Sequence, residues 1–350
     1  MSAKSILLGE ISSYKAIAIA YFIKKHYPSI LVYSYDTKKF TYNIHTKYSD
    51  RHFIVSLDKF EDDLSKIIRE HHIDYFFPVI NDSLSKLWQT KEAFYGTLDY
   101  LGDIASYHVL NDKILIHKLA LQLGLKAPVR YESTSEAKLP YVIKPTNLSS
   151  AKGVVYVRNE EDIPHDLDTN IIVQQYVEGV GVGYSFYCKN GVIMNGYGHR
   201  RLAEYPVSGG SSTYRETYQN DDMVNIAVKI VAHLNYTGFA MFEYKLTSEG
   251  DIYLIEVNPR IWGSINQGLA NGNNYFEGIL GKPEMPAMSP VKEKKTYLVP
   301  LFYLSLLKYS LKGQFKPLLT WIKNFSQNSA DVSLFSDSKG WLSMVLRKMS

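Results

Sequence analysis

The sequence contains very little cysteine: Cys188 is the single one among 350 residues. One cysteine excludes an internal disulfide and fits a reducing compartment. Cys188 lies in an apolar, strand-like run, which favours a small buried side chain over a nucleophile. These features predict a cytoplasmic protein.

Long apolar runs and strong charge are also lacking. No uncharged apolar stretch reaches about 18 residues, so no transmembrane helix is expected, and no signal peptide is expected after Met1. The net charge of +4 is too small to predict nucleic-acid binding. The charge is uneven, however, because residues 286–350 carry ten Lys or Arg and three Asp or Glu. The length and the 45% hydrophobic composition predict a globular protein of two or three lobes.

The glycine fingerprint of dinucleotide-binding proteins is missing as well. Short apolar strands alternate with helices over the first hundred residues, which predicts a small parallel sheet. The turn after the first strand reads GEISS, which is not G-x-G-x-x-G, so dinucleotide binding is rejected. A substrate is expected in the crevice at the carboxyl ends of these strands. The residues nearest to that crevice are Gly9, Glu10, Asn81 and Asp82.

The sequence does contain a strong hairpin pattern, FAMFEYKLTSEGDIYLIEVNPRIWGS, at residues 239–264. Two runs of alternating apolar residues flank a polar turn, where Gly250 supplies the positive φ that such turns need. An even pairing from a turn centred just before Gly250 places Glu243 opposite Glu256. Asn258 lies two residues further on and therefore shares their face. The hairpin is predicted to present two carboxylates and an amide on one surface.

Two carboxylates this close repel one another unless a cation lies between them. Oxygen ligands without nearby Cys or His suit Mg²⁺ or Mn²⁺ rather than Zn²⁺. Bound Mg²⁺ usually completes its shell with water and phosphate oxygens. Arg260 is placed to bind a phosphate or a substrate carboxylate. The alternative is an exposed hairpin with solvated glutamates, and the run E-V-N-P-R favours the metal site, with Glu243, Glu256 and Asn258 as ligands.

The pattern F-E, twelve residues, then E-V-N-P-R resembles the metal hairpin of the ATP-grasp superfamily, particularly its biotin carboxylase and carbamoyl phosphate synthetase branch. The resemblance implies a mixed α/β and α+β protein: a small parallel-sheet N-terminal domain, a two-lobed ATP-grasp fold and a helical C-terminal tail. We expect the N-terminal domain at residues 1–105 and the two lobes at 106–180 and 181–285. A basic helical tail follows at 286–350.

Two lysines and a loop fit the resemblance in the expected order. Lys113, in the first turn of a predicted helix, is similar to the first nucleotide-binding lysine of the superfamily. Lys144 ends an apolar strand and is similar to the second. The loop TNLSSAKG after that strand resembles the lid over the phosphates, with a plain hairpin and a long turn as the alternative. Its expected phosphate contacts are Ser149, Ser150 and Gly153.

The strand IIVQQYVEG resembles the hinge that holds adenine between the lobes. The resemblance implies that backbone groups of Gln175 and Val177 contact the adenine edge. Gln174 stands where many members have Glu. The segment VGVGYS that follows holds no acid, so Glu178 is the candidate for the ribose contact, and the nucleotide preference stays open.

Arginines supply further candidate catalytic groups. Arg200 and Arg201 are adjacent in a predicted strand and project to opposite faces, so one of them is expected to reach the site and bind a carboxylate or an acyl phosphate. A solvated basic strand is the alternative. Met241 stands where several peptide-forming members have arginine. Arg260 and Lys144 are therefore expected to supply the positive charge that stabilises the acyl phosphate.

The resemblance implies an ATP-dependent ligase that joins a carboxylate to an amine through an acyl phosphate and releases ADP and phosphate. ATP and Mg²⁺ (or Mn²⁺) are the expected cofactors, and small carboxylates and amines the expected partners. The alternatives are a bicarbonate-using carboxylase or carbamoyl-phosphate-like enzyme, and a non-catalytic nucleotide-binding module. The tail is expected to pack on the core or on a second subunit of a homodimer. Peripheral contact with an anionic membrane is the other interpretation of its basic, apolar pattern.

Overall fold

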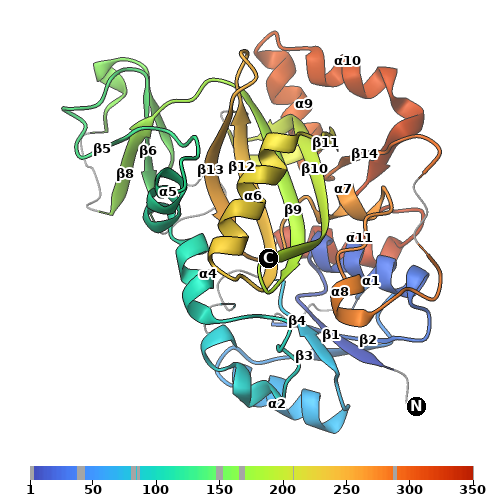
Figure 1. Ribbon diagram of the computed structural model, residues 1–350. Coiled ribbons are helices and arrows are strands. Elements are labelled where there is room, and N and C mark those ends of the chain that lie inside the picture. Colours follow the sequence, from blue (N-terminus) through green and yellow to red (C-terminus); the bar gives the residue numbers. More distant parts are fainter. Residues whose placement is uncertain are drawn as a thin grey trace.

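The computed structural model describes residues 4–37, 44–79, 84, 87–146, 153–164, 170–207, 209–286 and 290–349. The described residues form three sheets, which Figure 1 shows with the N-terminal sheet at one end of the molecule. Helices α9 (Leu301–Leu311) and α10 (Lys316–Lys323) lie at the other end. The predicted mixed α/β fold, with a parallel N-terminal sheet and a helical C-terminal end, is confirmed.

The N-terminal sheet is parallel, in the order β3-β2-β1-β4. The central strand β1 is fully buried, as its continuous apolar run predicts for a parallel strand covered on both faces. The bounds are β1 (Ser5–Gly9), α1 (Tyr14–His26), β2 (Leu31–Asp36), β3 (Arg51–Ile54), α2 (Phe60–Glu70) and β4 (Tyr75–Phe77).

A smaller antiparallel sheet follows, in the order β5-β8-β6-β7. Asp112 caps the helix that leads into it, because its carboxylate accepts hydrogen bonds from the backbone N–H groups of Ile114 (2.7 Å) and Leu115 (2.9 Å). The bounds are η1 (Lys91–Phe94), α4 (Ile104–Asn111), α5 (Lys113–Gln122), β5 (Arg130–Tyr131), β6 (Tyr141–Pro145), β7 (Val155–Val157), η2 (Glu160–Asp162) and β8 (Ile171–Gln175).

The largest sheet has the order β13-β12-β9-β10-β11-β14-β15, and α6 packs its buried side chains across it. The bounds are β9 (Val180–Lys189), β10 (Val192–Tyr205), β11 (Ser211–Thr217), α6 (Asp221–His233), β12 (Gly238–Leu246), β13 (Ile252–Asn258), α7 (Ile265–Leu269) and α8 (Glu277–Leu280).

The β12–β13 hairpin has the predicted pairing where it matters for the site. Glu243 lies opposite Glu256, and Gly250 in the turn has φ +91°. The expected even pairing is wrong nearer the turn, because the register shifts between Glu243 and Tyr244, which pairs with Leu254. One extra residue on β13 therefore forms a bulge beside the carboxylate pair.

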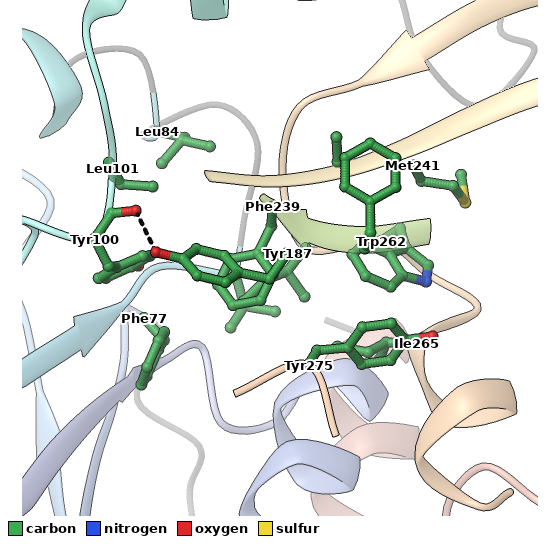
Figure 2. Close-up of a cluster of buried hydrophobic side chains, with 14 of the residues drawn as sticks. Phe77, Leu84, Tyr100, Leu101, Tyr187, Phe239, Met241, Trp262, Ile265 and Tyr275 are labelled. Carbon is green, nitrogen blue, oxygen red and sulfur yellow. Dashed lines mark hydrogen bonds between the residues drawn. The ribbon is translucent and has the colours of Figure 1, made fainter. Parts of the chain in front are cut away.

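One core joins the N-terminal sheet to the largest sheet (Figure 2). Phe77 of β4 packs edge-on against Phe239 of β12, with ring centroids 6.3 Å apart. The Tyr187 hydroxyl donates to the backbone oxygen of Tyr100 at 3.2 Å. This shared buried core holds the N-terminal sheet against the largest sheet. Side chains from the N-terminal part of the chain can therefore line a cavity on the largest sheet.

The C-terminal segment adds two strands that the sequence pattern did not predict. β14 (Lys295–Tyr297) pairs with β11, and β15 (Asn328–Ala330) pairs in parallel with β14, around α9, α10 and η3 (Phe325–Gln327). Helix α11 (Ser338–Met349) packs Trp341, Met344 and Val345 against Ile17 of α1. The tail thus packs on the core, as expected. Among the described residues, no helix is long and apolar enough to span a membrane.

Candidate active site

Two cavities among the described residues flank the carboxylate pair of the β12–β13 hairpin. The lobe cavity, about 140 Å³, lies between the small antiparallel sheet and the largest sheet. The inner cavity, about 180 Å³, lies between the largest sheet and α1. Arg201, Gly209, Glu243 and Glu256 line both cavities, so the carboxylates stand at their boundary.

The lobe cavity brings together most of the residues predicted to bind a nucleotide. Its lining includes Lys113, Lys144, Gln174, Gln175 and Val177. The backbone N–H of Gln175 donates to Val129 O at 2.8 Å, so this donor is already used within the protein.

Some of the predicted nucleotide residues lie elsewhere. Glu178 is exposed and does not line the cavity, whereas Glu204 of β10 does. Gly153 is also exposed, with φ +71°. Ser149 and Ser150 lie outside the described residues.

Lys144 is the buried cation of the lobe cavity, with 6% of its surface exposed. Burial lowers the pKa of Lys144 to about 8, while Glu256 opposes this shift and Lys113 adds to it. The Lys113 ammonium donates to Pro145 O at 3.1 Å, which holds it beside the end of the same strand. Lys113 and Lys144 line the same cavity as Glu243 and Glu256, a charge pattern that suits a polyanion carrying a cation.

The Asn258 amide bridges the carboxylate pair, and an arginine pairs with one of the two carboxylates. Asn258 Nδ2 lies 3.1 Å from Glu243 Oε1 and 3.5 Å from Glu256 Oε1, and Arg201 forms an ion pair with Glu243. Arg260 Nη2 donates to Asn258 Oδ1 at 2.7 Å. Burial raises the pKa of Glu243, and the neighbouring Glu256 adds to the rise while Arg201 opposes it. A cation between the two carboxylates would remove this penalty.

The donor chemistry of this group fits a hard divalent cation. Glu243 and Glu256 direct carboxylate oxygen atoms toward the position that a cation would occupy, and Asn258 directs its amide nitrogen there. A 180° flip of the Asn258 amide would direct its oxygen to that position instead. Within the described part of the chain, no group of three or more His, Cys, Asp and Glu side chains is arranged to hold a metal. Two carboxylates with phosphate and water oxygens match Mg²⁺ or Mn²⁺ better than Zn²⁺.

The two adjacent arginines do project to opposite faces of β10. Arg201 reaches both cavities, and its Nε is buried without a hydrogen-bond partner. Arg200 instead binds Glu216, with Nε at 2.9 Å from Oε1, and stacks over Tyr218. Arg200 lines neither cavity, so the structure places only Arg201 at the site.

The inner cavity contains a lysine that sequence reasoning missed. Lys15, in the first turn of α1, lines it together with Arg260. Burial lowers the pKa of Lys15 to about 7, and Arg260 and Arg347 add to the effect. The Lys15 ammonium donates to Val79 O at 2.6 Å. No local motif marks this lysine; only its position just after the first parallel strand places it at the crevice.

Ser212 and His199 complete the polar wall of the inner cavity. The Ser212 hydroxyl is buried without a partner and is available to a ligand. Burial lowers the pKa of His199 to about 3, with Arg201 and Arg215 adding to the shift. The wall at physiological pH therefore presents a neutral imidazole beside the arginines.

The crevice predicted as a substrate site near Gly9 and Glu10 is filled by the protein itself. Arg347 of α11 donates to Glu10 Oε2 at 2.5 Å and to Ser12 Oγ at 2.8 Å. A side chain at Gly9 would meet the Tyr35 hydroxyl at 2.8 Å. The prediction fails for these residues because a helix from the far end of the sequence occupies the space. Asn81 and Asp82 lie outside the described residues.

Residues 110–264, which include the two lysines and the carboxylate hairpin, match the family model of the ATP-grasp domain. The chain has an ATP-grasp domain. The superfamily suspected from the hairpin motif is therefore confirmed. A comparison of the sequence with curated proteins finds no match.

Solved structures with this fold include ligases and carboxylases. L-amino acid ligase from Bacillus licheniformis is 18% identical, with 81% of this chain and 76% of that chain covered and a TM-score of 0.56. Biotin carboxylase from Campylobacter jejuni is 14% identical, with coverages of 79% and 69% and a TM-score of 0.62. The biotin carboxylase domain of 2-oxoglutarate carboxylase from Hydrogenobacter thermophilus, in complex with MgADP and bicarbonate, is 12% identical, with coverages of 79% and 68% and a TM-score of 0.59. At these identities, the similarity establishes the fold of the ATP-grasp domain and its N-terminal sheet rather than a substrate.

Proposed function

We propose that the protein is an ATP-dependent ligase that joins a small carboxylate to an amine and releases ADP and phosphate. One observation carries the proposal: the carboxylate pair stands between two cavities that are both lined by cationic side chains. The lobe cavity, with Lys113 and Lys144, suits the phosphates of ATP. The inner cavity, with Lys15 and Arg260, suits a second anion. The transferring phosphoryl group would lie where the two cavities meet.

In the first step, an oxygen of the substrate carboxylate forms a bond to the γ-phosphorus, and the bond from that phosphorus to ADP breaks. Lys144 and Lys113 hold the phosphates, while Arg260 and Lys15 hold the carboxylate in line with them. Glu243, Glu256 and Asn258 would hold Mg²⁺, which neutralises charge on the phosphoryl group. Arg201, with its unpartnered Nε at the boundary, would bind the carbonyl side of the acyl phosphate.

In the second step, the amine nitrogen attacks the acyl carbon. The bond from that carbon to the phosphate oxygen breaks, phosphate leaves with the electron pair, and the nitrogen gives up a proton to the departing phosphate. Arg201 and Arg260 are only partly exposed, and shielding of the site from bulk water favours attack by the amine over hydrolysis of the acyl phosphate.

A bicarbonate-dependent reaction is the second candidate, and the E-V-N-P-R run with the carboxylase-like fold favours it. The inner cavity, about 180 Å³, accommodates bicarbonate as well as a larger acid. In that case bicarbonate takes the place of the carboxylate and forms carboxyphosphate by the same first step.

The deciding experiment measures ADP release with MgATP against a grid of amino acids, other small carboxylates and amines, with bicarbonate as a separate arm. ADP release that requires both an acid and an amine supports the ligase. Release that requires bicarbonate and an amine supports the carboxylase alternative. Nucleotide binding without release in any arm would contradict both reactions and leave a nucleotide-binding module.

Replacing Lys15 tests the assignment of the inner cavity. We expect Lys15→Met to raise KM for the acid about tenfold or more, the cost of one lost charge-assisted hydrogen bond, while KM for ATP changes little. The reason is that Lys15 lines the inner cavity and not the lobe cavity. Lys138→Met, an exposed lysine outside both cavities, is the control. Equal changes in both KM values would contradict the separation of the two cavities.

Nucleotide affinity should depend on pH through Lys144. Its folded pKa is about 8, and bound phosphate raises it, so binding takes up a proton. The affinity for the nucleotide is therefore highest below pH 8. Above pH 8 it falls by up to about tenfold per pH unit, until the pH reaches the pKa of Lys144 in the nucleotide complex. Titrating MgATP across this range by calorimetry measures the slope. Lys144→Arg, which stays charged, should remove the slope whatever its absolute affinity; an unchanged slope would rule out Lys144 as its source.

A further inference from the structure

The outward faces of α9 and α10 are apolar, which is the reverse of the usual pattern for surface helices. On α9, Phe302 and Leu306 point inward and pack near Tyr214 of the largest sheet. Three leucines lie on the opposite side at spacings of three and four residues, and Leu311 is 73% exposed. These leucines are Leu304, Leu307 and Leu311.

The second helix repeats this arrangement. Trp321 of α10 points inward and packs with the same cluster. Phe315, just before α10, and Leu319 and Ile322 within it follow one another at spacings of four and three residues, with exposures of 51%, 62% and 57%. Two consecutive helices thus expose apolar stripes of one periodicity, which is more than the scattered single side chains of an ordinary surface.

The charge around these stripes has one sign. Lys308, Lys312, Lys316 and Lys323 are all exposed on the two helices. The sequence has no Asp or Glu between Lys294 and Ala330. We call this surface, made by the six apolar side chains and the four lysines, the α9–α10 face.

We propose that the α9–α10 face binds the surface of an anionic lipid membrane. The apolar side chains would enter the boundary between headgroups and acyl chains, and the lysines would contact the anionic headgroups, as in interfacial amphipathic helices. The inward faces of both helices remain packed on the sheet, so binding needs no unfolding. Figure 1 shows α9 and α10 at the end of the molecule away from the N-terminal sheet, where a flat surface can approach them.

A second copy of the chain fits this face less well. A two-fold symmetric contact places the same patch against itself, which would bring the four lysines against four identical lysines without an acid in the segment to pair with them. An anionic membrane satisfies the apolar stripes and the positive charge together.

The test is flotation of the full-length protein with vesicles of phosphatidylcholine alone or with about one third phosphatidylglycerol, at low and high salt. We expect binding to the anionic vesicles, weakened by salt, and little binding to phosphatidylcholine alone. Lys308→Gln, Lys312→Gln and Lys316→Gln should each weaken it roughly fivefold. The triple variant Leu307→Ser, Leu311→Ser and Leu319→Ser should weaken it at least tenfold, because each side chain loses its burial in the lipid boundary.

Two triple variants with exposed side chains elsewhere are the matched controls. Leu57→Ser with Leu121→Ser and Val192→Ser is matched to the leucine variant. Lys138→Gln with Lys229→Gln and Lys282→Gln is matched to the lysine variants. An unchanged urea unfolding midpoint shows that a variant is folded. Vesicle binding that the controls reduce as much as the α9–α10 variants would overturn the proposal, as would no binding to anionic vesicles. A dimer in sedimentation that Leu311→Ser dissociates would also overturn it, in favour of a second copy on this face. None of these outcomes depends on the ligase proposal, since no turnover is measured.

Discussion

Glu256→Gln is expected to reduce turnover on the order of 10³-fold. The divalent ion that we propose between the two carboxylates would supply several kcal/mol of charge stabilisation at the phosphoryl group, and each 1.36 kcal/mol corresponds to a tenfold change in rate. Glutamine keeps the shape of the side chain but removes one of the two charges. Steady-state ADP release with saturating MgATP, acid and amine measures the loss.

Stability should move in the opposite direction in the same variant. Glu256 raises the pKa of Glu243, so the two neighbouring carboxylates repel each other in the absence of a cation. Removing one charge should leave the urea midpoint without ligands unchanged or higher. Glu249→Gln, in the exposed turn of the same hairpin, is the control and should retain both activity and stability. Full activity in Glu256→Gln, or a loss of activity explained by unfolding, would contradict the metal-site assignment.

Arg215→Met is expected to have the largest effect on folding. Arg215 of β11 is fully buried and forms an ion pair with Asp331, whose side chain is 1% exposed, just after β15. Its Nε also donates to Thr296 Oγ1 at 2.8 Å and its Nη1 to Ser212 O at 3.0 Å. Removing one member of a buried pair leaves the other charge uncompensated, at a cost of about 3–5 kcal/mol. Urea unfolding measures this loss.

Two comparisons separate the buried charge from other effects of the substitution. Arg200→Met, on the adjacent strand, breaks a pair whose arginine is 40% exposed, and should cost at most about 1 kcal/mol. The double variant Arg215→Met with Asp331→Leu removes both buried charges and should recover more than half of the loss. If the double variant is as unstable as the sum of both single variants, the ion pair is not the cause.

Much of the β12–β13 hairpin could be predicted from the sequence because its information is local. Alternation with period two assigns Glu243, Glu256 and Asn258 to one face, and a glycine with positive φ fixes the turn. The turn between β9 and β10 is equally local: Asn190 and Gly191 both have positive φ, as a two-residue hairpin turn of this sequence requires. The bulge beside Glu243 escaped prediction, because nothing in the alternation marks one extra residue.

The position of the cationic groups was only partly predictable. Lys144 could be predicted from the sequence because it lies near the end of a buried strand, where an unpaired lysine is rarely found. The sequence could also show that Arg200 and Arg201 project to opposite sides of the sheet. Which of them enters the site depends on which side of the largest sheet also carries Glu243 of β12. Lys15 escaped because it comes from a helix more than two hundred residues away from the hairpin and has no local signal.

The sequence by itself determined the superfamily, the order of its motifs and the pairing of the two carboxylates, since these rest on residue spacings within strands and turns and on the order of segments along the chain. The tertiary structure alone decided that Arg347 fills the predicted crevice at Glu10, that Lys15 enters the site, and that Asp331 pairs with Arg215. The physical reason is that charge pairs and filled cavities depend on which distant segments the common core brings together. Such contacts leave no periodicity in the chain.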